Sequence, residues 1–245
     1  MARYVYCFTN AGHSLPLDGL RGVGADEIAL RAIHHEGLAA VVSEAPEGLR
    51  PKRRDLVAHE TVLETLSAAG SVVPMRFGTV APDDDAVVAE LIRGATRYAE
   101  LLTRLSGHLE RNVKGAHQED ALLADLIAGY PELRAQNEAL RAAGGGSQPE
   151  QVAFGERMSL AVEQRRTRDA AYVVAALRPL AMLDRHAPPV KDCFANVSFL
   201  IPSAAQDDFD AVVAQLRTAM QGYAELRVSG PLPPYSFVDA VESTV

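Results

Sequence analysis

One proline-rich segment sets the first constraint on the fold: Gly230-Pro231-Leu232-Pro233-Pro234-Tyr235-Ser236-Phe237-Val238. A proline fixes φ near about −65° and has no N–H to donate, which excludes both a central strand and a helix interior. Residues that precede a proline are driven towards extended geometry, so a stiff, polyproline-like conformation is expected. We expect this segment to fold back and bury Tyr235 and Phe237 at the junction of the two halves of the chain.

A second informative stretch is Val72-Val73-Pro74-Met75-Arg76-Phe77-Gly78-Thr79-Val80, which predicts a strand over Ser71–Thr79. Pro74 cannot donate to a central ladder, so the strand is expected at a sheet edge or at a bulge. Gly78 likewise indicates a bulge or a close backbone approach. Arg76 in an apolar strand must pair with a carboxylate, cap carbonyl groups or reach the surface. Two roles therefore stand open for Arg76: a structural salt bridge and a contact to a partner protein.

The first half of the chain has the pattern of a modified ferredoxin-like unit. The elements expected are a strand at Arg3–Phe8, a loop at Thr9–Asp26, a hairpin of Glu27–Ile33 and Leu38–Ser43, a helix from Asp55 to Gly70, the strand Ser71–Thr79 and a helix starting at Pro82. Alternating apolar residues indicate the strands, and apolar residues three and four apart indicate the helices. This order is that of a ferredoxin-like unit whose first helix is replaced by a loop.

The second half predicts the ferredoxin-like order β-α-β-β-α-β with helical insertions. Its expected elements are a strand at Leu109–His117, a long helix at Glu150–Leu183, strands at Val190–Asp192 and Cys193–Ile201, a helix at Gln206–Tyr223 and a strand at Glu225–Ser229. The predicted class is α+β, with two modified ferredoxin-like halves whose mixed or antiparallel sheets are covered by helices. The predicted domains are residues 1–105 and residues 106–245, the second with the proline-rich tail.

Composition narrows the class of partner. The 245 residues include 24 Lys and Arg against 32 Asp and Glu, a formal net charge of −8, which disfavours nucleic acid. No apolar run reaches the roughly 18 residues of a membrane span, so no membrane insertion is expected. Cys7 and Cys193 do not have the spacing of a metal-binding or redox-active cysteine motif. They are expected to be reduced thiols in a cytoplasmic protein.

The sequence contains no recognisable set of catalytic or metal-binding residues. His34 and His35 are adjacent on the expected hairpin and point to opposite faces, so an exposed turn is favoured over a metal site. His59 lies on the apolar stripe of its helix, where a structural role is favoured over catalysis. The chain lacks the phosphate-binding, nucleophile-elbow, H-E-x-x-H and C-x-x-C motifs. We expect neither cofactor nor metal.

A basic run of Arg50, Lys52, Arg53 and Arg54 lies directly ahead of the helix that carries His59. Cations at a helix N-terminus oppose the helix dipole, so local stability does not explain them. A solvated loop and a docking surface for an acidic partner are both compatible with this run.

Taken together, these motifs resemble the gas vesicle F/L family (GvpF and GvpL), which typically has V-x-P-x-R-F-G-T-V in its first half and ends on G-P-W-P-P-Y-S-F. The resemblance extends over nearly the whole chain, including the opening Tyr4-Val5-Tyr6, the pair His59-Glu60 and the run Asn196–Ile201. Leu232 stands where the family commonly has Trp. The motif positions carried over are His59, Pro74, Gly78, Gly230, Pro231, Pro233, Pro234, Tyr235 and Phe237.

The resemblance implies a ferredoxin-like fold and a role as an accessory or minor structural protein of gas vesicles. The protein is expected to be a cytoplasmic, vesicle-associated assembly factor without enzymatic activity, which binds the major shell protein GvpA or other accessory proteins. The contact is expected on the first half, with Arg53, Arg54, Arg76 and Phe77 as candidates. The alternative is a small-molecule or metal-dependent enzyme on the same scaffold, which a closed pocket joining His59, Arg76 and a carboxylate would favour.

Overall fold

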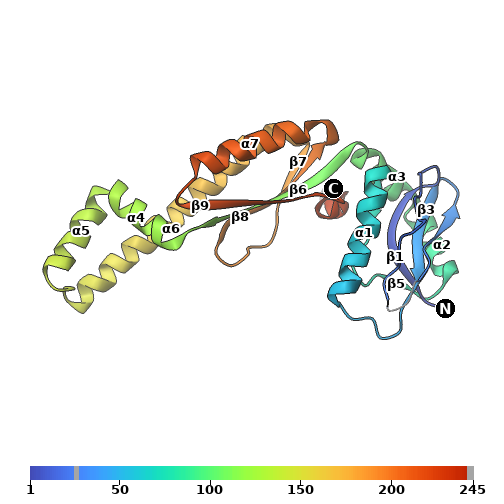
Figure 1. Ribbon diagram of the computed structural model, residues 1–245, viewed down its shortest axis with the longest axis horizontal. Coiled ribbons are helices and arrows are strands. Elements are labelled where there is room, and N and C mark those ends of the chain that lie inside the picture. The colour runs from blue at the N-terminus through green and yellow to red at the C-terminus, as the bar shows by residue number, and fades with distance from the viewer. Residues whose placement is uncertain (25–27, 242–245) are drawn as a thin grey trace. The chain divides into compact units, whose positions relative to one another are not determined.

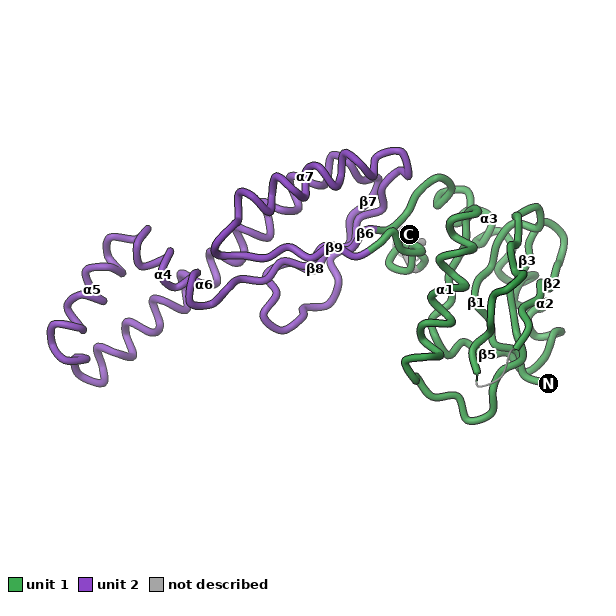
Figure 2. Tube along the Cα trace, viewed as in Figure 1, with its two compact units in different colours: residues 1–110, 230–245 green, residues 111–229 purple. Residues whose placement is uncertain are grey.

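The computed structural model describes residues 1–24 and 28–241 and consists of two compact units (Figures 1 and 2). Unit 1 comprises Met1–Glu110 together with the C-terminal segment from Gly230, and unit 2 comprises Arg111–Ser229. Both are α+β units with antiparallel sheets and packed helices, as predicted. The division differs from the predicted one, in which the C-terminal segment belonged to the second half. Two partly buried side chains of this segment, Tyr235 and Val238, pack against the core of unit 1.

Unit 1 has the strand order β2-β3-β1-β4, with β5 also pairing with β1. Its strands are β1 (Arg3–Asn10), β2 (Arg31–His35), β3 (Leu38–Glu44), β4 (Val72–Pro74) and β5 (Val80–Ala81). Its helices are α1 (Arg53–Ala69), α2 (Asp84–Arg93) and α3 (Ala95–Leu105). This is the ferredoxin-like order with a loop in place of the first helix, so that prediction is confirmed. The predicted hairpin forms as β2 and β3, although Glu27 lies outside the described residues.

Two apolar layers hold unit 1 together because β1 is buried on both faces. Tyr4, Tyr6 and Cys7 pack towards α1, whereas Val5 and Phe8 pack towards α2 and α3. A register shift between Val5 and Cys7 explains why two successive residues share a face. The sheet is therefore covered by α1 on one side and by α2 and α3 on the other (Figure 1).

Of the predicted strand Ser71–Thr79, only β4 (Val72–Pro74) forms, and β5 (Val80–Ala81) begins just beyond its predicted end. β4 pairs with β1 through Pro74 and Cys7, and β5 pairs with the start of β1 through Ala81 and Arg3. Between them the chain leaves the sheet, and Gly78 has φ 92°, a left-handed value that favours glycine. β4 is at the end of the strand order, so the edge position predicted from Pro74 is confirmed. The expectation that Arg76 lies within a strand is wrong, because Arg76 is exposed in this loop.

Unit 2 has the strand order β7-β8-β6-β9 of a complete ferredoxin-like unit. Its strands are β6 (His108–His117), β7 (Leu183–His186), β8 (Cys193–Pro202) and β9 (Ala224–Leu232). Its helices are α4 (Glu119–Gly129), α5 (Pro131–Ala142), α6 (Gln148–Leu177) and α7 (Gln206–Ala219). The helices α4 and α5 pack with the first part of α6 around a small core of Leu122, Leu126, Leu133, Met158 and Ala161.

Two predicted boundaries in unit 2 are wrong. The helix predicted to run to Leu183 ends at Leu177, as α6. Leu183–His186 is therefore free to pair with β8 as β7, so the second strand of the unit is β7 and not Val190–Asp192.

The prediction of a polyproline-like conformation for the C-terminal segment is also wrong in part. β9 continues through Pro231 to Leu232 as an edge strand, and a 3₁₀ helix, η3, follows at Tyr235–Val241. The Gly230–Pro231 peptide bond is cis.

Candidate functional site

The motif residues of unit 1 meet around His59, which α1 places on its buried face. His59 Nε2 lies 3.1 Å from the Met75 carbonyl oxygen and 3.2 Å from the Tyr235 hydroxyl, and His59 Nδ1 lies 3.0 Å from the Tyr4 hydroxyl. A carbonyl oxygen only accepts, so Nε2 carries the proton and Nδ1 accepts from Tyr4. The Tyr4 oxygen in turn accepts from the Gly78 N–H at 3.1 Å.

Aromatic rings enclose this imidazole. The ring centroids of Tyr4 and Tyr6 both lie 5.6 Å from that of His59, and that of Phe77 lies 5.7 Å away. Burial lowers the pKa of His59, against a smaller opposing effect of its bond to Met75. Burial also raises the pKa of Tyr4 to about 12. The cluster is therefore neutral near pH 7, with each ring nitrogen of His59 engaged.

The C-terminal segment closes the cluster by folding back onto unit 1. Phe237 is 1% exposed, and Val238 packs against the core between the sheet and α2 and α3. Ser236 donates twice to the buried carboxylate of Glu110, from its N–H at 2.9 Å and from its hydroxyl at 2.6 Å. Tyr235 supplies the contact to His59 described above. We call this set of contacts, made by Tyr235, Ser236 and Phe237, the C-terminal latch.

The structure thus brings most of the motif positions together, as neighbours in a packed core. Pro74 is buried next to Met75, and Pro233 and Pro234 are buried just before the latch. Gly230 and Pro231 lie outside the cluster, exposed on β9. Sequence reasoning missed Glu110, whose only local signal is its place near the start of the predicted strand Leu109–His117, between Leu109 and Arg111.

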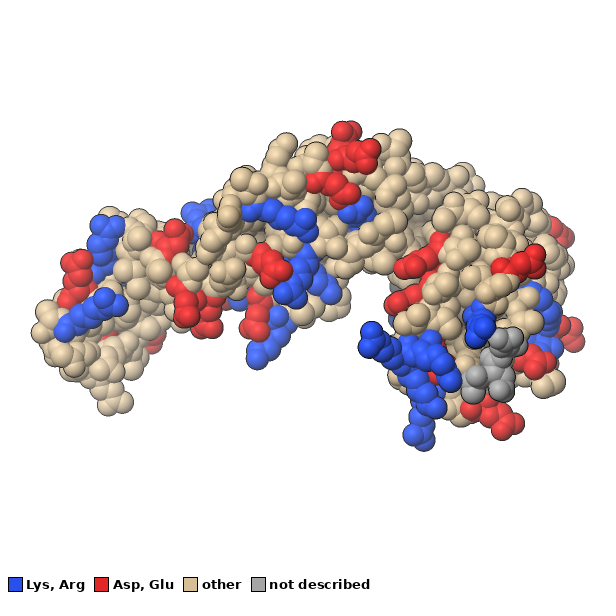
Figure 3. Space-filling view, in the orientation of Figure 1, with Lys and Arg blue, Asp and Glu red and all other residues tan. Residues whose placement is uncertain are grey.

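The basic run divides into two kinds of residue. Arg54 donates from Nε to Asp55 at 3.1 Å, and the Asp55 carboxylate is buried beneath it. Arg50, Lys52 and Arg53 are exposed, and no ion pair engages them within the described residues. Lys52 is the N-cap of α1 and makes no side-chain capping bond. Figure 3 shows Lys and Arg side chains gathered on unit 1, the unit that carries α1.

The alternative enzyme reading requires His59, Arg76 and a carboxylate in one closed pocket. His59 is surrounded by tyrosine and phenylalanine rings, and Arg76 is exposed. Phe77 is only partly buried and packs on Tyr4 with ring centroids 5.9 Å apart. Among the described residues there is also no group of three or more His, Cys, Asp or Glu side chains that can hold a metal ion.

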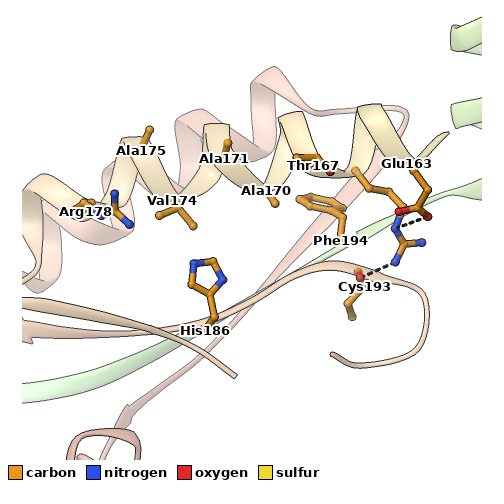
Figure 4. Close-up of a pocket in the computed structure, with 11 residues that line it drawn as sticks. Glu163, Thr167, Ala170, Ala171, Val174, Ala175, Arg178, His186, Cys193 and Phe194 are labelled. Carbon is orange, nitrogen blue, oxygen red and sulfur yellow. Dashed lines mark hydrogen bonds and ion pairs between the residues drawn. The ribbon is translucent and has the colours of Figure 1, made fainter. Parts of the chain in front are cut away.

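Unit 2 has an open groove of about 670 Å³ between α6 and the strands β7 and β8 (Figure 4). Its floor is apolar, and two arginines that line it are engaged in hydrogen bonds. Arg166 donates to the Cys193 carbonyl oxygen at 2.8 Å, and Arg178 pairs with Asp184 through bonds of 2.8 and 3.0 Å. These contacts brace the helix against the hairpin.

A buried polar network in unit 2 was also missed from the sequence. Asp169 on α6 accepts from His117 at 2.9 Å and from Arg165 at 2.8 Å, and Arg165 also reaches Asp125 on α4 at 2.6 Å. The Arg165 guanidinium lies 4.3 Å from the ring centroid of Tyr223. The spacing of Arg165 and Asp169 by four residues on one helix is the signal that sequence offers. The network ties α4 and α6 to the sheet.

Comparison with known proteins agrees with this architecture. The family model described as gas vesicle synthesis protein GvpL/GvpF matches residues 2–239. Gas vesicle protein F of Streptomyces sp. (strain CB03234) is 45% identical over 240 residues, covering 98% of this chain and 100% of that protein. Gas vesicle protein L of the same organism is 29% identical over 265 residues, covering 99% and 95%.

The fold is also that of solved structures. The crystal structure of GvpF from Anabaena sp. PCC7120 superposes with a TM-score of 0.83 at 24% identity, covering 97% of this chain and 98% of that one. GvpF from Microcystis aeruginosa gives a TM-score of 0.77 at 24% identity, covering 97% and 99%. No helix among the described residues is long and apolar enough to cross a membrane. On the match over residues 2–239 and the 45% identity, the chain belongs to the GvpL/GvpF family of gas vesicle synthesis proteins.

Proposed function

We propose that this protein is a cytoplasmic, gas vesicle-associated and non-enzymatic assembly factor that binds the shell protein GvpA or other accessory gas vesicle proteins during gas vesicle assembly. Family membership supports the link to gas vesicles. The geometry of unit 1 supports binding in place of catalysis, since the motif residues His59 and Tyr235 are engaged with each other, and His59 also with Tyr4 and Met75, inside a packed cluster. A binding protein needs an exposed surface rather than a reactive pocket.

The contact is proposed on unit 1, at the exposed end of α1 and the loop before β5. Arg53, Arg54 and Arg76 are exposed there, and Phe77 supports the loop by packing on Tyr4 and His59. The observation that carries the proposal is the unpaired charge at the start of α1, which local stability does not explain. An aggregation-prone apolar subunit requires a partner that covers it until it is incorporated.

The experiment is co-expression of the intact chain with GvpA and the other gas vesicle proteins of its host, followed by purification under non-denaturing conditions. The affinity tag belongs at the N-terminus, because Met1 is 81% exposed whereas the latch is buried at the other end. We expect at least one gas vesicle protein to co-purify above the level retained by an unrelated tagged protein. Retention of none would refute the proposed function.

A further inference from the structure

We propose that the first turn of α1, with the loop ahead of it, is a docking surface for an acidic, partly apolar segment of a gas vesicle protein. This inference rests on the proposed function and specifies the chemistry of the partner. The surface consists of Arg50, Lys52, Arg53, Leu56 and Val57, and we call it the α1 docking surface.

Its charge is uncompensated within the described chain. Arg50, Lys52 and Arg53 make no ion pair, and the one acidic residue in the first turn, Asp55, is buried and engaged with Arg54. These cations also stand at the positive end of the helix dipole, where negative charge is favoured. The chain as a whole carries a net charge of −8, so three unpaired cations within four residues are a local exception. A negatively charged partner compensates both the side chains and the dipole.

Apolar surface adjoins the charge. Leu56 is 37% exposed and Val57 is 52% exposed, and they follow Arg53 by three and four residues. Side chains at these spacings lie on the same face of a helix, so Arg53, Leu56 and Val57 form one continuous strip. Protein interfaces typically combine exposed apolar side chains at the centre, which lose their water on binding, with charged residues at the rim, which guide the partner into place.

The strip also sets the register of its partner. Glu60 follows Val57 by three residues and is exposed, so the acidic character of α1 begins one turn beyond the apolar pair. The partner segment therefore places a carboxylate near Arg53, an apolar side chain near Leu56 and Val57, and no carboxylate near Glu60. Nucleic acid fits less well. Its phosphates repeat along the strand, so a strand that runs from Arg53 along α1 places a phosphate beside the carboxylate of Glu60, about two helical turns further on.

The test uses the intact protein and fluorescence anisotropy with labelled peptides of about 20 residues that overlap along GvpA and the other gas vesicle proteins of the host. The test variant carries Arg50→Glu, Lys52→Glu and Arg53→Glu. The matched control carries Lys114→Glu, Arg141→Glu and Lys191→Glu in unit 2, which changes the net charge equally at exposed residues without an ion pair. A third variant, Val57→Ser, removes apolar surface alone.

We expect acidic peptides to bind the wild type and the control, and the test variant to bind at least about tenfold more weakly. Binding should weaken as salt rises from 50 to 500 mM, and Val57→Ser should weaken it with the salt dependence unchanged. Undiminished peptide binding by the test variant overturns the inference while the proposed function stands. Failure of every peptide to bind, together with failure of co-purification, overturns both. Tighter binding of a 20-nucleotide RNA than of any peptide also overturns the inference.

Discussion

Removing the most buried side chain of the C-terminal latch, by Phe237→Ala, is expected to destabilise unit 1 selectively. Phe237 is 1% exposed, and deleting a fully buried phenyl ring costs about 3–5 kcal/mol through lost burial and the cavity left behind. A domain of this kind has a total stability of about 5–15 kcal/mol, so the loss is a large fraction of it. Each kcal/mol shifts the melting temperature by roughly 4 °C in a domain of this size, which predicts a fall of about 10–20 °C.

Differential scanning calorimetry is the appropriate assay because it reports each unit's transition separately. The transition of unit 1 should fall and that of unit 2 should stay within about 2 °C of the wild type, since Phe237 belongs to unit 1. The matched control is Ser236→Ala, which removes one of two hydrogen bonds to Glu110 and should cost only about 1–2 kcal/mol. An unchanged unit 1 transition in Phe237→Ala would show that the latch does not support the fold.

Three further predictions concern the remaining structural contacts. Burial lowers the pKa of His59, so the unfolded chain binds a proton at this residue more readily than the folded chain does. The contribution of His59 to the stability of unit 1 is therefore complete above about pH 6.5 and is lost as the pH falls below that value. Thermal melts between pH 8 and pH 5 should show this loss in the wild type and much less of it in His59→Phe. Gly78→Ala should destabilise unit 1 by about 1–2 kcal/mol, because Gly78 has φ 92°. Gly155→Ala within α6 should stabilise unit 2 by up to about 1 kcal/mol, because a Cβ at that position meets open space. Changes of melting temperature with the same sign in the two variants would contradict this. Asp169→Asn should cost unit 2 about 3–5 kcal/mol because it leaves Arg165 and His117 buried without their shared carboxylate, and a urea midpoint equal to that of the wild type would disprove the network's role.

Local chemistry made much of the fold predictable. The absence of an N–H on Pro74 was enough to place its strand at the sheet edge, because that requirement needs no knowledge of the partner strand. The break after Pro74 was not predictable, since it depends on how β4 and β5 each pair with β1. The position of β7 was missed for the same reason: its four residues form a strand only because β8 lies alongside them.

The candidate site was less predictable because its contacts join segments far apart in the sequence. His59 meets Tyr4, Met75 and Tyr235, and no periodicity relates those positions. The division of the basic run was likewise hidden, since Arg53 and Arg54 are chemically identical neighbours. Only the tertiary fold buries Asp55 beneath Arg54 and leaves Arg53 facing solvent.

The central claim, that this protein binds another gas vesicle protein through the start of α1, is tested most directly by photo-cross-linking in cells that form gas vesicles. A photoreactive phenylalanine analogue replaces Val57, which is 52% exposed, and in a parallel strain replaces Tyr172 of unit 2, which is 50% exposed. We predict that the probe at position 57 cross-links an acidic segment of GvpA or of an accessory gas vesicle protein, identified by mass spectrometry, and that the probe at position 172 does not. Cross-links to gas vesicle proteins from position 172 and none from position 57 would contradict the account.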